Sequence, residues 1–303
     1  MLRHCREPLR TNSIKGSMIS DQQAEQLIRR AYNSIRLTRA VRGGLLCVLF
    51  YGLVRASDFN GGTTGTGVLI AVCAVWIGLS IQARRKANLT TRASQLIAAG
   101  QLSQAREILS GVCRGLCMHK PVLLMACHNL AVILQKQRQW PAAWQFCELV
   151  RNWARKNNNR IRILSEAVRA ECSLAMNNLA GAYESLSVLS RTALNISERL
   201  GVLQAEITYG IRIGRSDTLM ADLPNKVALA GLLPTEQAGL AHASLALAAH
   251  FAGQSARRDW LWRKASLYCP ARELLAGQPA FGPVAEAVST AETQACKNVS
   301  GQV

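Results

Sequence analysis

Two apolar runs near the N-terminus constrain this chain of 303 residues more than any other feature. The first reads VRGGLLCVLFYGLV over residues 41–54, and the second reads TTGTGVLIAVCAVWIGLSI over residues 63–81. A bilayer core takes about 20 helical residues, with roughly 17 as the lower limit. The second run meets that length, and the first does so only if it is extended, with Arg42 and Arg55 reaching the two interfaces. The runs therefore predict a two-helix transmembrane hairpin at residues 43–82.

Two other arrangements of these runs remain open. One is a single span with a re-entrant or interfacial segment, and the other is a pair of helices buried in a soluble core. A cleaved signal peptide fits poorly, because the apolar region begins about 40 residues into the chain and no small-residue cleavage pattern closes it.

Basic residues flank the hairpin unevenly. The loop RASDFNGGTTG between the runs carries one Arg offset by one Asp, whereas Lys and Arg gather on the two outer sides. Because Lys and Arg are retained in the cytoplasm, both termini are expected there, in an integral protein of an inner or cytoplasmic membrane. The cations assigned to the membrane surface are Arg29, Arg30, Arg36, Arg39, Arg42, Arg84, Arg85 and Lys86.

Residues 20–42 predict a basic amphipathic helix ahead of the hairpin. Ser20 and Gln23 have capping-box spacing, and apolar residues recur along one side with arginines elsewhere. We interpret this helix either as lying on an anionic leaflet or as an ordinary solvated helix whose arginines only fix the topology. A mitochondrial transit peptide is a third interpretation, which the acidic residues of this region disfavour. Residues 1–19 are expected to be disordered.

Composition restricts the partners without selecting one. The chain has 36 Lys and Arg against 18 Asp and Glu, a formal net charge of +18, which favours anionic partners such as lipid head groups, nucleic acid or an acidic protein. With 49% hydrophobic residues and only 8 Pro, the composition is that of a folded chain. The ten Cys include no CxxC pair, which indicates a reducing compartment rather than a disulfide scaffold.

From residue 91 onward the pattern is helical and repeats. Apolar residues recur at helical spacing, and the stretches GQLSQAREIL, RQWPAAWQFC, NNLAGAYESL, RSDTLMADLP and GQSARRDWLW align on one Ala. A small residue there lets two antiparallel helices approach closely, and a period of 20 to 50 residues is typical of solenoids. The aligned residues are Ala105, Ala143, Ala182, Ala221 and Ala256, at spacings of 38, 39, 39 and 35 residues.

These units resemble the tetratricopeptide repeat family. In the best match, HNLAVILQKQRQWPAAWQFCELV, the family's apolar and small positions hold Leu130, Ala131, Leu134, Ala143, Cys147 and Val150. The last unit places Ala256 and Trp260 at packing positions. The resemblance implies an α-solenoid of about five helical hairpins over residues 91–283, whose concave face binds a protein or peptide, followed by a tail at residues 284–303. Because the periods exceed the family's period of about 34 residues, another helical-hairpin solenoid remains open.

Catalytic motifs are missing from the sequence. It has no Gly-rich phosphate loop after a strand, no G-x-S-x-G elbow and no H-E-x-x-H, so neither an enzyme, a cofactor nor a small-molecule substrate is expected. One cluster has a metal-like composition, with Cys113, Cys117 and His119, but its spacing matches no common zinc site. We therefore interpret these as core cysteines and expect no metal.

The strongest basic patch of the repeats is RNWARKNNNRIR. We interpret it either as a solvated loop between repeats or as a binding site for an acidic peptide, a lipid or nucleic acid. Its cations are Arg151, Arg155, Lys156, Arg160 and Arg162.

Together these patterns predict an all-α, membrane-anchored helical-repeat scaffold that binds a protein or peptide partner at the cytoplasmic face. The alternative is a basic helical-repeat module that binds nucleic acid or anionic lipid.

Overall fold

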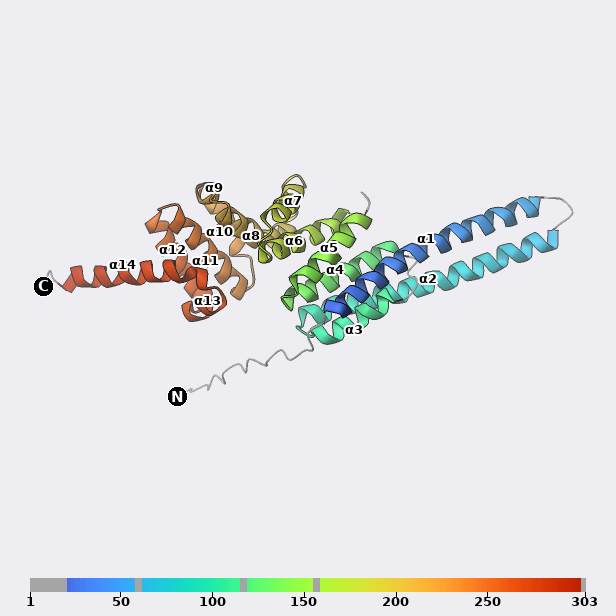
Figure 1. Ribbon diagram of the computed structural model, residues 1–303, viewed down its shortest axis with the longest axis horizontal. Coiled ribbons are helices and arrows are strands. Elements are labelled where there is room, and N and C mark those ends of the chain that lie inside the picture. Colours follow the sequence, from blue (N-terminus) through green and yellow to red (C-terminus); the bar gives the residue numbers. More distant parts are fainter. Residues whose placement is uncertain (1–20, 58–61, 115–118, 155–158, 301–303) are drawn as a thin grey trace. The chain divides into compact units, whose positions relative to one another are not determined.

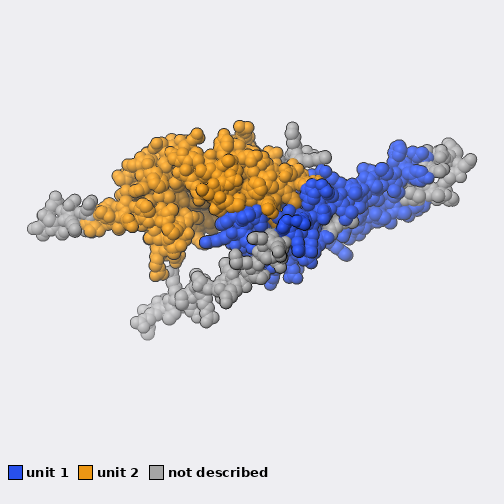
Figure 2. Space-filling model, in the orientation of Figure 1, with its two compact units in different colours: residues 1–142 blue, residues 143–303 orange. Residues whose placement is uncertain are grey.

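Two compact units make up the chain, residues 1–142 and residues 143–303 (Figure 2). The described residues contain helices and no strand, so the predicted all-α class is confirmed (Figure 1). The computed structural model describes residues 21–57, 62–114, 119–154 and 159–300.

The first four helices lie in unit 1, and α5 begins there and continues into unit 2. These four are α1 (Asp21–Ser57), α2 (Gly62–Ala98), α3 (Leu102–Cys113) and α4 (Lys120–Lys136), and α5 is Trp140–Trp153. The other elements of unit 2 are α6 (Asn159–Ala175), α7 (Leu179–Ser190), α8 (Ile196–Arg212), α9 (Ser216–Ala221), α10 (Leu223–Ala230), α11 (Thr235–Phe251), α12 (Ser255–Tyr268), α13 (Ala271–Gly277), the 3-10 helix η2 (Pro279–Phe281) and α14 (Gly282–Ser300).

Both N-terminal helices run through the boundaries that the sequence suggested. α1 has 37 residues and joins the predicted amphipathic helix to the first apolar run. α2 also has 37 residues and joins the second apolar run to the start of the repeat region. Residues 82–91 contain neither Gly nor Pro, so nothing local ends the helix there. In the described part of the chain, no helix has the length and apolarity that crossing a membrane requires.

Five three-residue turns repeat along the chain. In each one the middle residue has a positive φ, between 57° and 77°, and the next N–H donates to the carbonyl five residues before it. This is the Schellman arrangement, which ends a helix by pairing its last free carbonyls. Among the described residues these middle positions are the only ones with positive φ, and they recur every 38, 39, 37 and 39 residues. They are Gly100, Arg138, Asn177, Gly214 and Gly253.

The turns divide the repeat region into five helix pairs: α2–α3, α4–α5, α6–α7, α8–α9 and α11–α12. The first helix of each of the last four pairs has 17 residues. Within unit 2, α6 packs on α8 and α8 packs on α11, so the first helices of successive pairs are neighbours. Packing of this kind is typical of stacked helical hairpins, and it agrees with the predicted number of about five.

The aligned alanines have the predicted environment in three of the five pairs. Ala105, Ala143 and Ala182 are fully buried in α3, α5 and α7. The prediction is wrong for Ala221, which is the exposed last residue of the six-residue helix α9. α9 is short because the next helix, α10, begins almost directly after it at Leu223, with Pro224 in its first turn.

The alignment is also wrong for the last pair. Ala256 is exposed, and the inner face of α12 carries Leu261, Trp262 and Ala265 instead. α12 therefore packs on α11 through a face different from the one that the repeat alignment suggested.

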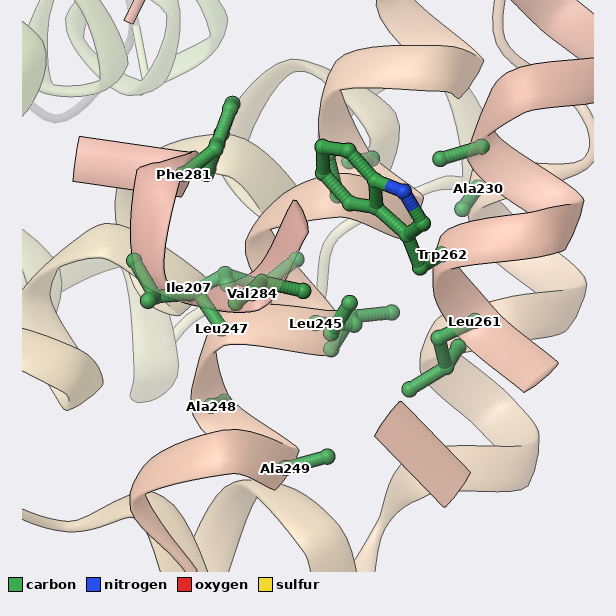
Figure 3. Packing of buried hydrophobic residues seen from close by; sticks show 14 of the residues in the cluster. Ile207, Ala230, Leu245, Leu247, Ala248, Ala249, Leu261, Trp262, Phe281 and Val284 are labelled. Atoms are coloured by element: carbon green, nitrogen blue, oxygen red, sulfur yellow. The ribbon is translucent and has the colours of Figure 1, made fainter. Parts of the chain in front are cut away.

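The core of unit 2 surrounds α11. Residues 241–249 of this helix are all buried, because α8, α9, α12 and the C-terminal elements pack around it. Leu245, Leu261 and Val284 come from three different elements and meet in this core (Figure 3). Because Val284 belongs to α14, the segment predicted as a tail contributes to the core and is helical up to Ser300.

Candidate functional site

The outer parts of α1 and α2 form an apolar arm, defined here as residues 43–54 and 70–82. The two helices pack on each other, yet large apolar side chains stay exposed on both of them. Leu46 is 66% exposed, Phe50 70% and Ile77 58%. Exposed apolar surface of this kind marks a protein or membrane interaction site. The arm is thus a candidate attachment surface.

The arginines predicted at the membrane surface occupy different settings. Arg29 pairs with Glu25 at 2.8 Å on the exposed side of α1, and the guanidinium of Arg36 lies 4.5 Å from the ring centroid of Tyr32. The side chain of Arg42 lies outside the described residues. The exposed members of this set in the described part of the chain are Arg29, Arg30, Arg36, Arg39, Arg84 and Arg85.

Lys86 differs from the other predicted surface cations. Its side chain is buried, and its Nζ donates a hydrogen bond of 3.1 Å to the carbonyl of Val112 in the last turn of α3. A cation at that place satisfies a helix end and complements its dipole. Lys86 therefore holds α2 to α3 inside unit 1 and does not lie on the exposed surface to which the sequence assigned it.

The predicted basic patch is not one exposed surface in the part of the chain that is described. Arg155 and Lys156 lie outside the described residues. Arg160 is 3.7 Å from a carboxylate oxygen of Glu198, and Arg162 is half-buried. Arg151, at the end of α5, points into a group of carboxylates.

That group is an ionic cluster formed by three helices of unit 2: Glu148 and Arg151 of α5, Glu166 and Arg169 of α6, and Glu184 of α7. Arg169 Nη2 lies 2.8 Å from Glu184 Oε2, and Arg169 Nε lies 2.6 Å from Glu148 Oε1. Arg151 pairs with Glu184 and lies 3.5 Å from both Glu148 and Glu166. The cluster thus connects α5, α6 and α7 through charged side chains.

Burial makes this cluster sensitive to the loss of any member. The side chains of Arg169 and Glu166 are only 4% and 2% exposed. Burial raises the pKa of Glu166, whereas hydrogen bonds from Arg151 and then Arg169 lower the pKa of Glu184 to about 2. A buried charge that loses its partner costs several kcal/mol, roughly 3 to 5. Arg151 is therefore part of an internal network, which reduces its availability to an anionic partner.

The sulfur and imidazole groups do not form a metal site in the described residues. Cys113 is buried, His119 is exposed, and Cys117 lies outside the described part of the chain. Burial raises the pKa of Cys172 to about 12 and lowers the pKa of His128 to about 4. Cys172 and His128 are therefore neutral near pH 7 and belong to the packed interior.

An exposed stripe on α12 was missed by sequence reasoning, which placed Trp260 in the core. Trp260 is 50% exposed and Leu267 is 84% exposed, and Arg263 lies exposed between them on the same face. The Nζ of Lys264 lies 5.1 Å from the Trp260 ring centroid. The sequence WLW carried the signal, because two Trp residues two positions apart cannot share one face of a helix. Trp262 is the buried member of the pair.

No family model, no curated protein and no solved structure matches this chain. What the described residues define is a class: an all-α protein of repeated helical pairs with an exposed apolar arm.

Proposed function

We propose that this protein is a membrane-anchored, non-catalytic scaffold, which uses the apolar arm for attachment and its helical repeats for binding a protein or peptide. The observation that carries the proposal is the exposure of the arm. Phe50 and Ile77 face outward although α1 and α2 have already packed together. Each large apolar side chain gains about 1.5 to 3 kcal/mol when it leaves water. A bilayer offers that gain to all sides of the arm at once.

The charges beside the arm support the same attachment. Exposed arginines precede it on α1, and Arg84 and Arg85 follow it on α2. Each basic residue near an anionic leaflet adds about 1 kcal/mol. We retain in this proposal the hairpin expected from the apolar runs at residues 43–82, as two spans with both termini in the cytoplasm, although the described part of each helix does not by itself meet the requirement for a span.

The partner surface that we favour is the exposed stripe of α12. It combines two large apolar side chains, Trp260 and Leu267, with the cations Arg257, Arg263 and Lys264. Aromatic residues and arginines are enriched at interface hot spots. An amphipathic peptide with acidic residues beside its apolar face would complement this stripe in both polarity and charge. The resemblance of the repeats to tetratricopeptide repeats agrees with a peptide-binding role.

The nucleic-acid alternative has less support. Two of the five cations in the predicted basic patch, Arg151 and Arg160, pair with carboxylates of the same chain. Nucleic-acid binding also depends steeply on salt, because each phosphate contact releases counterions. Binding of nucleic acid that weakens steeply between roughly 50 and 200 mM salt would restore this alternative.

Membrane extraction tests the attachment. The full-length protein should stay in the membrane pellet in high salt and in alkaline carbonate, since apolar insertion resists both. A variant with Leu46→Gln, Phe50→Gln and Ile77→Gln should move to the soluble fraction. The control is Leu232→Gln with Leu267→Gln, which removes exposed apolar side chains from unit 2 and should stay in the pellet. Release of the unmodified protein by salt alone would contradict the proposal.

Affinity capture from native membranes tests the partner surface. The unmodified chain should retain a protein that the variant Trp260→Ala with Leu267→Ala loses. Tyr183→Ala is the matched control, because this residue is also exposed in unit 2 but lies on α7. Equal capture by all three forms would exclude the α12 stripe as the binding surface.

A further inference from the structure

Two adjoining cavities of about 540 and 550 Å³ lie in unit 1. Residues of α1 and α3 line the first, and residues of α1 together with Arg114 line the second. Arg30 of α1 and Arg114, just after α3, line both cavities. We call these two cavities the basic groove. The helices that form it pack on each other although Arg30 and Arg114 are 84 positions apart in the sequence.

Arginines dominate the charge of the basic groove. Arg106 lines the first cavity and Arg36 lines the second, in addition to the two arginines that they share. Among the described residues, the only carboxylate that lines either cavity is Glu107. The first cavity is thus lined by three arginines and one carboxylate, and the second by three arginines.

A cavity in unit 2 shows that this imbalance is not general. It has a volume of about 450 Å³, and Arg199 and Lys226 face Glu206 and Asp222 in it. Lys226 Nζ lies 3.8 Å from Glu206 and 3.4 Å from Asp222, so the charges of that cavity neutralise each other. By count, the described lining residues of the basic groove include more cations than carboxylates, and this surplus positive charge favours an anion.

We propose that the basic groove binds a phosphate group. Guanidinium groups donate paired hydrogen bonds to phosphate oxygens, and arginines from two directions can hold one phosphate between them. The same cavity wall supplies neutral donors, the amides of Gln26 and Gln104 and the hydroxyl of Ser103. Binding would also relieve the repulsion among like charges that the contact of α1 with α3 brings together.

The phosphate has two chemical sources, a free phosphate compound or the head group of an anionic lipid. The lipid source rests on the membrane attachment proposed above, because it needs the groove to lie near a leaflet. The free source does not depend on that attachment. Both sources use the same guanidinium contacts, so one set of variants tests them.

The experiment uses the full-length protein in neutral detergent. Calorimetric titration with pyrophosphate measures binding of a free phosphate compound, and titration with phosphatidylglycerol in mixed micelles measures binding of a lipid head group. The variant Arg30→Gln, Arg106→Gln, Arg114→Gln should weaken binding roughly 100-fold, because each arginine contributes about fivefold. The matched control is Arg92→Gln, Lys136→Gln, Arg138→Gln, which removes the same charge from exposed positions of unit 1 outside both the groove and the proposed membrane surface and should change binding by less than about threefold.

Binding of pyrophosphate that the groove variant loses supports the free source, and binding of phosphatidylglycerol alone supports the lipid source. Failure of the unmodified protein to bind either probe, or equal weakening in the two triple variants, overturns the proposal. The single variant Arg30→Gln repeats the test with one exposed residue changed, and it should weaken binding about fivefold. The groove variant keeps the apolar arm, so it should still resist carbonate extraction. Loss of phosphate binding can thereby be distinguished from loss of membrane attachment.

Discussion

The apolar arm and the α11–α12 pair are both helical hairpins rich in apolar residues, yet they place them in opposite environments. Phe50 in the arm is 70% exposed, whereas Leu245 and Ala248 in α11 are 0% exposed. α11 packs against α8, α9 and α14 as well as α12, while many large apolar side chains of the arm stay exposed after α1 has packed on α2. Apolar content therefore predicts that a helix must be covered, and only the neighbouring elements show what covers it.

Residue size separates the two regions further. α11 carries Ala at many of its buried positions, which lets helices approach it on every side. The arm carries mainly Leu, Val, Ile and aromatic residues. Side chains of this size keep a further helix at a greater distance than Ala does. Small residues on all sides suit a helix in the middle of a packed protein, and large ones suit a helix that meets hydrocarbon.

The largest effect should come from the ionic cluster. Arg169→Ala removes a buried cation and leaves Glu166 and Glu148 with fewer partners, which should cost about 3 to 5 kcal/mol of unfolding free energy. Arg29→Ala breaks an exposed pair on α1, and exposed pairs are worth at most about 1 kcal/mol. Hydrogen exchange by mass spectrometry reports each helix separately, so α6 should lose protection only in the first variant. Similar protection in the two variants would mean that the cluster does not stabilise unit 2.

Removing an apolar side chain should cost much more stability in the core of unit 2 than in the arm. Leu245→Ala leaves a cavity in the core of unit 2 and should cost about 2 to 5 kcal/mol. Leu46→Ala removes a side chain that is already exposed and should change the protection of the repeat helices by less than about 0.5 kcal/mol. The measurement is again the exchange protection of α11 in the full-length protein. An equal loss for both variants would show that the arm folds back onto the repeats.

Lowering the pH should change the stability of the two units in opposite directions. Burial lowers the pKa of His128 in α4 from 6.5 to about 4, so the folded unit 1 holds a neutral ring. In the unfolded chain the imidazole of His128 is protonated below about pH 6.5. The stability that unit 1 has above this pH is therefore lost as the pH falls towards about 4. The loss amounts to about 3 kcal/mol. Glu171 in α6 behaves in the opposite way, because burial raises its pKa from 4.5 to about 7. The contribution of Glu171 to the stability of unit 2 therefore increases as the pH falls from about 7 towards 4.5.

Exchange protection, corrected for the intrinsic rate at each pH, tests this contrast. Between pH 7 and pH 5, α4 should lose protection, and His128→Gln should remove that loss. Over the same range Glu171→Gln should remove a gain in α6. If the two helices respond to acid with the same sign, the burial of one of these groups is not what sets its charge.

Several features of the fold were accessible from the sequence because they depend on local pattern. The helical class follows from apolar periodicity, and the buried Ala105, Ala143 and Ala182 follow from their spacing. The alignment failed at Ala221 and Ala256, where a proline and a helix with apolar residues on two faces changed the packing. Repeat spacing alone cannot report such changes, since it assumes that every unit packs alike.

The candidate sites were harder to predict, because their residues meet across long sequence distances. Lys86 finds its carbonyl partner 26 positions away, and nothing in the charge run ARRK sets it apart from its neighbours. Arg151 pairs with carboxylates from two other helices. The basic groove likewise forms only when α1 lies against α3. Charge counting identifies such residues as cations and cannot tell a surface cation from a paired one.

The smallest effect concerns the turns, which both regions use. Gly100 follows the end of α2, which runs through the arm, and Gly253 separates α11 from α12, both with positive φ. A side chain at Gly253 would meet no atom within 4 Å, so Gly253→Ala tests backbone strain alone and should cost about 1 kcal/mol. Arg138 adopts the same conformation with φ of 60°, and Arg138→Gly should therefore stabilise its turn by up to about 1 kcal/mol.

Thermal unfolding of the full-length protein, followed by circular dichroism, measures both changes. The two substitutions should shift the melting temperature in opposite directions, because one introduces and the other relieves a left-handed non-glycine residue. Gly111→Ala is the control, since this glycine lies inside α3 without positive φ and should gain stability from helix propensity. A fall in melting temperature for Arg138→Gly would show that its side chain makes contacts worth more than the strain, and this turn would then differ in its energetics from the glycine turns whose geometry it shares.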